Sequence, residues 1–550
     1  MESFGIWGLI PPVLTIALAF ITKDVIVSLF LGILSGSLIV AHGNPAVAVL
    51  NLTDNLANVL VDGWNIRIFL FCALLGGLVG MLSRTGSSRA FGRWAAKKIN
   101  SPKTSMLMAW FCGLLIFIDD YFNSLAVGTI MRPITDKNNV SRAKLSYILD
   151  CTAAPVCILV PISSWVITIM SYLRDSEGFS VFADAGINEF SYFIRSVPYN
   201  VYALLTLIMV LYIAFSGRDF GPMKKSESLA KKGILYNEEY GDATGEVVME
   251  GDEKADKAKG FDMLLPIIVL VISALVMFPM TTYLSIAASD GISLSEAMGT
   301  MNVGDAFNNT DASMALFYSA VITVFISYVY YICRGLFGVK EASEALMEGI
   351  KSMVPALLIL VMAWTIGGII KSSPADGGLG LASYLSDVVV GGGFPLGLVP
   401  VIVFVLSALI AFATGTSWGT FAIMIPITMP IAIGLGQAMA LDFPSLLNST
   451  LICTSAVLGG AVFGDHASPI SDSTILSSTG SGCPHLEHVA TQLPYAVTVA
   501  VCTGLGFLVG GLTLSLLWTW IIALAAFALA MFALPNILGD KEISFRKKAR

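Results

Sequence analysis

The chain has 550 residues, of which 56% are hydrophobic and only 13% are charged, and its net charge at pH 7 is -7. A water-soluble fold of this size needs a far more polar surface, and the mean hydropathy of +0.80 excludes one. No basic tract is long enough to indicate a nucleic-acid partner. Long apolar runs separated by short polar segments, without the strict alternation of a barrel strand, predict an all-α polytopic membrane protein in contact with lipid.

Eleven apolar runs are long enough to cross a bilayer of about 30 Å. They cover residues 5–22, 25–41, 66–83, 146–172, 198–216, 262–285, 312–333, 355–371, 447–476, 493–513 and 514–536. Two further stretches, 104–131 and 397–436, are each interrupted halfway by polar residues, and we expect them to form re-entrant hairpins. The chain then divides into a first repeat at 1–216, a hydrophilic cytoplasmic linker at 217–260, a second repeat at 261–513, and a final helix with a basic tail at 514–550.

Basic residues set the expected orientation. The segments 84–103 and 132–144 are rich in Lys and Arg, which predicts that both lie in the cytoplasm and that 104–131 enters and leaves the membrane on one side. The segments 174–197 and 286–311 carry mostly acidic residues and are expected outside. We therefore expect a multi-pass protein of the cell membrane with its N-terminus outside and its C-terminus in the cytoplasm.

The two halves of the chain align through five short matches in the same order. The matched pairs are Gly76-Gly77 with Gly367-Gly368, Pro133-Ile134-Thr135 with Pro426-Ile427-Thr428, Cys151-Thr152 with Cys453-Thr454, Pro161-Ile162-Ser163 with Pro469-Ile470-Ser471, and Pro198-Tyr199 with Pro494-Tyr495. Five spans and a hairpin precede the second half, so the second half enters the membrane in the opposite sense. Inverted repeats with broken helices are typical of secondary transporters, whose ligands bind near the membrane midplane.

The tip of the first hairpin reads FIDDYFNS and places two adjacent carboxylates deep in the membrane. One carboxylate at that depth costs about 2.5 to 3.5 kcal/mol on insertion scales, so a pair indicates a bound cation, a proton or water. The alternative is that one of them only caps the returning half-helix. The predicted cation- or proton-binding residues are Asp119, Asp120, Asn123, Ser124, Thr152, Asp465 and Asp472, with Na⁺ placed at Asp119, Asp120 and Asp472.

The tip of the second hairpin reads ATGTSWGT, and the span after each hairpin is interrupted by proline and polar residues. Hydroxyl groups and freed backbone carbonyls at such breaks suit a small cation or the carboxylate of a substrate, although ordinary helix packing also uses these residue types. The predicted substrate-binding residues are Ser163, Ser164, Thr414, Thr416, Ser417, Thr454, His466, Ser468 and Ser471. A packing role for His466 is as compatible with the sequence as a titrating one.

One rival interpretation is an intramembrane serine hydrolase. Gly415 to Gly419 fit the pattern G-x-S-x-G, which makes Ser417 the nucleophile and Asp465 and His466 its partners. Adjacent residues on a helix point about 100° apart, which disfavours the hydrogen bond that this triad needs. The sequence therefore favours a transporter over an enzyme.

The stretches FIDDYFNSLAVGTIMRPITDKNNVSRAKLSYILDCTAAP, GTSWGTFAIMIP and GDHASPISDSTIL resemble the NhaC-type Na⁺/H⁺ antiporters of the ion transporter superfamily, over most of the chain. The resemblance implies a homodimer with a scaffold domain and an elevator-type transport domain. We expect Na⁺/H⁺ exchange, with no cofactor besides these ions. The alternative is Na⁺- or H⁺-coupled transport of a small carboxylate or amino acid.

Overall fold

The computed structural model describes residues 3–22, 24–87, 90–91, 99–241, 256–372, 374, 377–381, 384, 395–469 and 471–538. Regular structure in these ranges is helical, and they contain no strand. The all-α expectation is therefore confirmed. The basic residues between 92 and 98 and the tail after 538 lie outside the described residues.

The first half of the chain contains both long helices and short ones. Its helices are α1 (Ile10–Thr22), α2 (Val25–Val40), α3 (Pro45–Val61), α4 (Gly63–Ser83), α6 (Pro102–Leu115), α7 (Asp120–Lys137), α8 (Arg142–Thr152), α9 (Ala154–Cys157), α10 (Ser164–Asp175), α11 (Ser180–Ala183), α12 (Glu189–Ser196), α13 (Val201–Ser216) and α14 (Pro222–Ala230). Short 3₁₀ turns lie at Gly5–Leu9, Val197–Tyr199 and Glu238–Tyr240. The apolar run 146–172 is thus divided among α8, α9 and α10.

The second half repeats the pattern of a broken pair followed by a broken span. Its helices are α15 (Gly260–Asp290), α16 (Leu294–Thr300), α17 (Val303–Asn308), α18 (Ala312–Cys333), α19 (Val339–Ser352), α20 (Val354–Lys371), α22 (Val399–Thr414), α23 (Ser417–Ala438), α24 (Phe443–Ala467), α25 (Asp472–Ser481), α26 (His485–Thr513) and α27 (Leu516–Ile537). A 3₁₀ turn at Leu396–Leu398 leads into α22. The apolar run 447–476 is divided between α24 and α25.

Eight helices of the described part are long and apolar enough to cross a membrane, and ten spans result if each of two bent helix pairs counts as one. The apolar runs of the sequence predict eleven spans and two hairpins. The numbers differ because α1 and α2 have only 13 and 16 residues, and because the expected span 146–172 is divided among the short helices α8, α9 and α10. Conversely, the arms of the second hairpin, Leu396–Thr414 and Ser417–Ala438, are each long enough to span.

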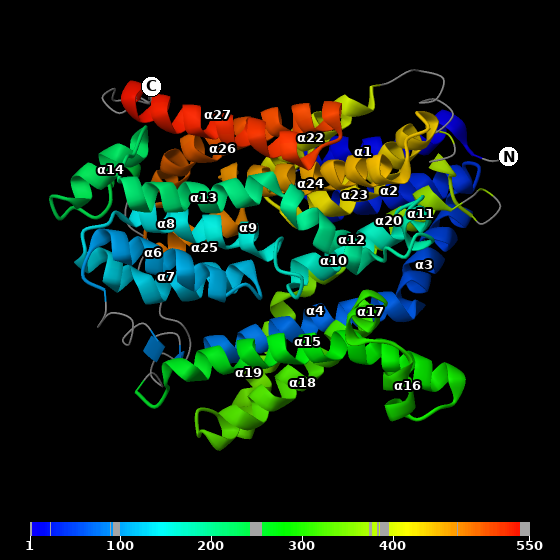
Figure 1. Ribbon diagram of the computed structural model, residues 1–550, viewed down its shortest axis with the longest axis horizontal. Helices are drawn as coiled ribbons and strands as arrows, with labels where there is room; N and C mark the ends of the chain where they lie inside the picture. Colours follow the sequence, from blue (N-terminus) through cyan, green and yellow to red (C-terminus); the bar gives the residue numbers. More distant parts are fainter. Residues whose placement is uncertain are drawn as a thin grey trace.

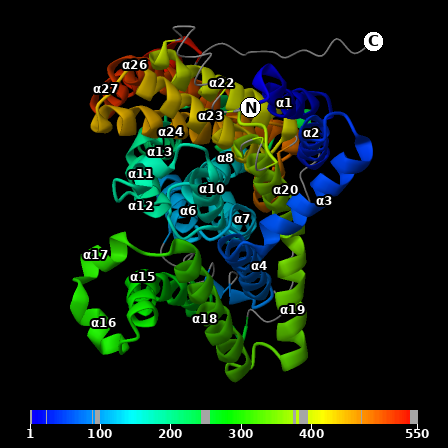
Figure 2. The ribbon, with the colours of Figure 1, turned by 90° about the vertical axis from the view of Figure 1, so that its right-hand side faces the viewer.

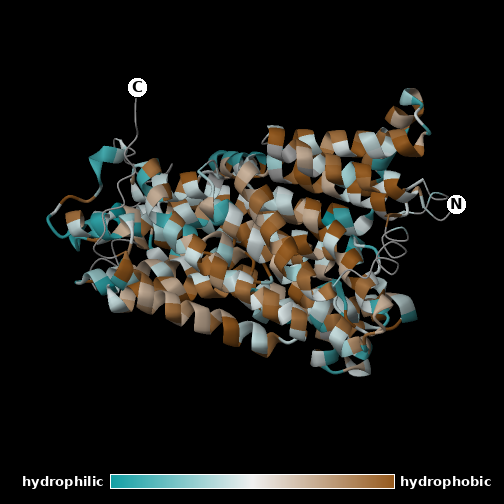
Figure 3. Cartoon of the chain, turned by 90° about the horizontal axis from the view of Figure 1, so that it is seen from above, coloured by the Kyte–Doolittle hydropathy of each residue, from teal (hydrophilic) through white to brown (hydrophobic). Residues whose placement is uncertain are grey.

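The helices form two adjoining bodies that share one long direction (Figure 1). One body contains α4, α15, α18 and α19, and the other contains both broken pairs and both broken spans (Figures 1 and 2). Figure 3 shows hydrophobic residues along the middle of the molecule and hydrophilic residues at its two ends. That distribution matches helices that cross a membrane along the long direction.

Glycines allow close packing within the first body. A Cβ atom on Gly349 of α19 would lie 2.1 Å from the carbonyl oxygen of Gly76 on α4, and a Cβ on Gly80 would lie 2.3 Å from the carbonyl oxygen of Ala345. Small residues four positions apart, such as Gly76 and Gly80, commonly allow close contact between helices in membranes. Gly367 and Gly368 on α20 match Gly76 and Gly77 in the repeat. A Cβ added to either of them would have no other described group within 4 Å, so these two glycines do not serve close helix packing.

In the second body, α7 lies against α25 with backbone in contact with backbone. A Cβ on Gly480 would lie 2.5 Å from the carbonyl oxygen of Ser124, and a Cβ on Gly128 would lie 2.6 Å from the carbonyl carbon of Gly480. Beside these glycines, the hydroxyl of Ser477 donates to that of Ser124 at 3.2 Å. The contact fixes the tip of the first hairpin relative to α25.

We expect Gly480→Ala to lower the free energy of unfolding by about 1 to 3 kcal/mol, because the added methyl group forces α7 and α25 apart. Thermal unfolding of the detergent-solubilised protein measures the change. Gly368→Ala is the matched control, because an added Cβ there meets no described group and alanine favours the helix. Equal melting temperatures for Gly480→Ala and the wild type would contradict the close contact.

Candidate functional site

The first hairpin turns at residues 116–119, between α6 and α7. Asp119 has an extended backbone and is the N-cap of α7, where its Oδ1 accepts a hydrogen bond of 2.9 Å from the backbone N–H of Phe122. Such a cap satisfies one of the free N–H groups at a helix start and opposes the helix dipole. The capping role considered for one of the two aspartates therefore belongs to Asp119.

Asp120 is the first residue of α7 and is 2% exposed. Its Oδ1 accepts a hydrogen bond of 3.1 Å from the indole N–H of Trp165 on α10. Its carboxyl group lies within electrostatic reach of both Asp119 and Asp465. Asp120 is therefore subject to repulsion from two further buried carboxyl groups, one of them from the opposite repeat.

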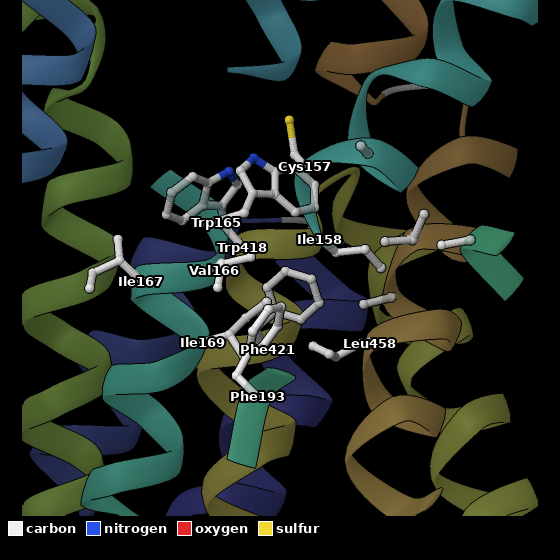
Figure 4. Close-up of a cluster of buried hydrophobic side chains, with 14 of the residues drawn as sticks. Cys157, Ile158, Trp165, Val166, Ile167, Ile169, Phe193, Trp418, Phe421 and Leu458 are labelled. Carbon is white, nitrogen blue, oxygen red and sulfur yellow. The ribbon is translucent and has the colours of Figure 1, made fainter. Parts of the chain in front are cut away.

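An aromatic cluster supports the indole of Trp165. The ring centroid of Trp165 lies 5.8 Å from that of Trp418 and 5.6 Å from that of Phe421, both in edge-to-face contact (Figure 4). Ile169 and Phe193 are drawn beside Phe421 in the same view. This packing holds the indole N–H on Asp120, and the rings belong to α10 of one repeat and α23 of the other.

The second hairpin turns at Gly415, which has a φ of 70° in the left-handed region, and Thr416 makes no side-chain cap for α23. The carboxylate of Asp465 occupies that position instead. Its Oδ2 accepts hydrogen bonds from the hydroxyl of Ser417 at 2.7 Å and from the backbone N–H of Ser417 at 3.3 Å. Its Oδ1 accepts from the hydroxyl of Ser471, the N-cap of α25. Asp465 thus joins the starts of two helices.

Two buried oxygens near the first break have no hydrogen-bond partner in the part of the chain that the structure describes. The amide nitrogen of Asn123 donates to the carbonyl oxygens of Gly113, Ile116 and Thr152 at 2.7, 2.8 and 3.0 Å, which fixes the amide orientation. Its Oδ1 is left unpaired, as is the hydroxyl of Ser164 at the start of α10. Buried polar atoms are usually paired, so these oxygens are available to a ligand.

Comparison with known proteins identifies the family. The sequence profile of the Na⁺/H⁺ antiporter family matches residues 156–512. This chain belongs to the Na⁺/H⁺ antiporter family. The matched region holds α10 of the first broken span, the second hairpin and the second broken span. The resemblance seen in the sequence motifs is confirmed, and the protein is a multi-pass membrane transporter of the secondary type.

Named relatives cover the chain to different extents. An uncharacterised protein of Haemophilus influenzae is 40% identical over 520 residues, which is 93% of this chain and 92% of that protein. The malate-2H⁺/Na⁺-lactate antiporter of Bacillus subtilis is 31% identical over 36% of this chain and 40% of that protein. The solved YdaH transporter of Alcanivorax borkumensis is 12% identical, with a TM-score of 0.47 over 87% of this chain and 88% of that one.

Several predicted residues of this antiporter family member lie close to the carboxylates. Ser163 is the N-cap of α10, where its hydroxyl accepts from the backbone N–H of Val166 and donates to the carbonyl oxygen of Cys157. Ser471 and Ser417 contact Asp465 directly. The side chain of Asp472 lies outside what the structure describes, although its backbone begins α25 beside Ser471.

Other predicted residues have different surroundings. The hydroxyls of Thr152 and Thr414 donate to carbonyl oxygens of their own helices, and the hydroxyl of Ser468 donates to the carbonyl oxygen of Phe412. Thr454 lies 11 positions before Asp465 on α24, about 16 Å at 1.5 Å per residue. Its hydroxyl contacts Tyr192 and Met429. Thr416 is half-buried at the tip of the second hairpin.

His466 faces away from Ser417. Its Nδ1 lies 3.1 Å from the hydroxyl of Tyr202, and its Nε2 lies 3.5 Å from the sulfur of Cys151. Because the hydroxyl of Ser417 donates to Asp465 and not to an imidazole, the contacts around it are not those of a serine–histidine–aspartate triad.

Two groups of buried residues, one at the carboxylates and one in a separate cluster, were not among the predicted site residues. Trp165 holds Asp120, and Asp150 of α8 lies beside His488 and Gln492 of α26. His488 and Gln492 are four residues apart and therefore lie on one face of a long apolar helix. This polar pair on an apolar helix was the sequence signal that could have indicated a site. Their partner Asp150 lies more than 330 residues earlier, and no local pattern links the two.

Among the described residues, no group of three or more His, Cys, Asp or Glu side chains is arranged to hold a metal ion by itself. A cation at these carboxylates would need hydroxyl and backbone oxygens as further ligands. The breaks at 116–119 and 415–416, with the orphan oxygens of Asn123 and Ser164, provide oxygens of that kind.

Proposed function

We propose that the protein exchanges Na⁺ for H⁺ and that both ions compete for the buried carboxylates of Asp119, Asp120 and Asp465, with Asp472 as a further ligand. The observation that carries the proposal is that Asp120 and Asp465 lie at the breaks of opposite repeats and are connected through packed neighbours: Trp165 donates to Asp120 and packs on Trp418, and Ser417, the residue before Trp418, donates to Asp465. Buried carboxylates of like charge are costly unless a cation or a proton neutralises them. Binding one ion therefore displaces the other, which is sufficient for antiport.

A second candidate is exchange or Na⁺-coupled uptake of a small carboxylate or amino acid. The Bacillus subtilis relative is named as an antiporter of malate and lactate, and a shorter match is named as an arginine/ornithine antiporter. In this chain α7, α10, α23 and α25 all begin near the carboxylates. Helix N-termini bind anionic groups, so an organic anion has donors available there.

We also propose a membrane orientation, two repeats and an oligomeric state for the protein. α1 begins near one end of the long direction and α27 ends at the other (Figure 1). This supports an N-terminus outside and a C-terminus in the cytoplasm, with repeats at 1–216 and 261–513. We propose a homodimer whose scaffold includes the body of α4, α15, α18 and α19, with transport and not hydrolysis as its activity.

Proteoliposomes with an imposed pH gradient and an internal pH dye test whether the protein exchanges Na⁺ for H⁺. Addition of Na⁺ without any organic solute is expected to collapse the gradient, and K⁺ is not. Malate, lactate, arginine or ornithine added with Na⁺ tests the second candidate. Proton movement only in the presence of one of these solutes would overturn simple Na⁺/H⁺ exchange and favour a solute carrier.

Ser417→Ala separates transport from hydrolysis. We expect the variant to bind Na⁺ about tenfold more weakly, because Asp465 loses a charge-assisted hydrogen bond worth about 1.5 to 3 kcal/mol. Hydrolysis of fluorogenic esters and peptides is expected to equal the protein-free background in both variant and wild type. Hydrolysis by the wild type that disappears in Ser417→Ala would contradict the assignment as a transporter.

A further inference from the structure

A second buried titratable cluster lies away from the carboxylates that we assign to Na⁺. It consists of Asp150 on α8, His466 on α24, and His488 with Gln492 on α26, and none of these side chains is more than 2% exposed. The Nε2 of His488 lies 3.3 Å from Asp150 Oδ2, and the Nε2 of His466 lies 3.9 Å from the same oxygen. Gln492 donates to that oxygen at 2.6 Å.

The hydrogen bonding of His488 is incomplete. Among the described residues, neither ring nitrogen of His488 has a hydrogen-bond partner, and Asp150 Oδ1 has none either. A neutral imidazole has one N–H donor and one acceptor nitrogen, so both are buried without partners, which is costly. A further proton on the ring would make an imidazolium beside a carboxylate, and a small rotation would pair the two at a distance already near 3.3 Å.

The groups that face His488 come from several helices. His466 approaches from α24, and its other nitrogen contacts Tyr202 of α13, while Tyr147 of α8 stacks on its ring. On α26 itself, His485 contacts the carbonyl oxygen of Pro469. Glu487 is directed to the segment 218–241, where it accepts from the hydroxyl of Ser226 and the backbone N–H of Asn237. Asp150 is therefore the carboxylate that pairs with His488.

Two polar side chains connect this cluster with the helix end that bears Asp465. The hydroxyl of Thr474 on α25 lies 3.2 Å from Asp150 Oδ2 and 3.5 Å from the backbone oxygen of Asp465. The amide nitrogen of Gln492 donates both to Asp150 and to the backbone oxygen of His466. Movement of the α24–α25 break on cation binding would therefore change the surroundings of Asp150 and His488.

We propose that His488, held by Asp150, is a second proton-binding site that exchanges its proton in step with Na⁺ binding at Asp120 and Asp465. The inference rests on the proposed Na⁺/H⁺ exchange and names a further residue for it. A proton from water binds the free ring nitrogen of His488 and gives an imidazolium paired with the Asp150 carboxylate. The same proton returns to water when Na⁺ binds, and no other bond is formed or broken.

His488→Gln in proteoliposomes is the first test. The variant is expected to bind Na⁺ within about twofold of the wild type at alkaline pH, yet to move protons at least about tenfold more slowly near neutral pH, with an altered pH profile. His42→Asn is the control, because His42 is exposed and its positive φ of 49° is tolerated by asparagine. A pH profile of His488→Gln that coincides with the wild type would overturn the role of His488 alone. Absence of Na⁺-driven proton movement in the wild type would overturn the antiporter proposal itself.

A measurement on the wild type does not depend on the folding of a variant. Infrared difference spectra recorded on adding Na⁺ to protein labelled with ¹⁵N-histidine are expected to show imidazole bands that move with the label. The chain has four histidines, so the same bands should persist in His42→Asn and His485→Asn. Na⁺-induced spectra with carboxyl bands but no histidine band would overturn the proposal while leaving Na⁺ binding intact.

Discussion

Asp120→Asn is expected to reduce Na⁺-driven proton movement in proteoliposomes by at least about a hundredfold. Asparagine keeps the size of the side chain and can still accept the hydrogen bond from the Trp165 indole, which is 3.1 Å away in the wild type. The amide has no charge to attract Na⁺ and takes up no proton in the pH range of the assay. The variant therefore loses Na⁺ binding and proton binding together. Initial rates of dye response after a Na⁺ pulse give the ratio.

Asp54→Asn is the matched control for this variant. Asp54 is exposed on α3, far along the chain from both breaks, and its neutralisation removes one negative charge without touching the site. It is expected to transport at the wild-type rate. Full exchange by Asp120→Asn, with normal reconstitution, would show that the transported ions bind elsewhere.

Asp465→Asn is expected to combine a loss of Na⁺ binding of at least about tenfold with a loss of stability of about 1 to 3 kcal/mol. Asp465 accepts hydrogen bonds from Ser417 and Ser471 and takes the place of the missing side-chain cap at α23. An amide lowers the strength of these bonds and puts a donor beside N–H and O–H groups that also donate. Thermal unfolding in detergent and Na⁺ titration measure the two losses separately.

The comparison with Asp120→Asn makes this prediction specific. The Asp120 carboxyl accepts a hydrogen bond from Trp165 and is repelled by two other carboxyl groups. Its neutralisation removes this repulsion and is expected to leave the melting temperature unchanged or higher. Asp465→Asn is expected to melt lower. The reverse order of melting temperatures would contradict the structural role assigned to Asp465.

Local patterns in the sequence predicted the helical fold and the interruptions at both hairpins and both broken spans. Asp119, Asp120 and Ser417 lie at helix starts because polar and glycine residues stop each apolar run, and that signal is visible within ten residues. The number of spans was harder to predict, because α1 and α2 are short and α22 and α23 are long. Hydropathy reports composition and not where a helix ends.

Contacts between distant segments account for what the sequence did not show. The indole of Trp165 was not expected to bind Asp120, because the two side chains meet only when α10 crosses α7. The pair of Asp150 and His488 joins α8 to α26 across the two repeats. Thr454, the repeat partner of Thr152, was predicted to bind substrate because it lies in the interrupted span, yet its hydroxyl contacts Tyr192 and Met429. Repeat symmetry predicts related backbone, whereas each side chain follows its own neighbours.

The dependence of Na⁺ affinity on pH tests the central claim most directly, because competition requires that each Na⁺ displaces a proton from a carboxylate. Calorimetric titration of the purified wild type with NaCl, at a series of pH values, gives the apparent Kd. We predict that the Kd rises about tenfold for each unit by which pH falls below the pKa of the site, and that Asp120→Asn removes this slope. A Kd that stays constant from alkaline to acidic pH would contradict competition between Na⁺ and H⁺ at these carboxylates.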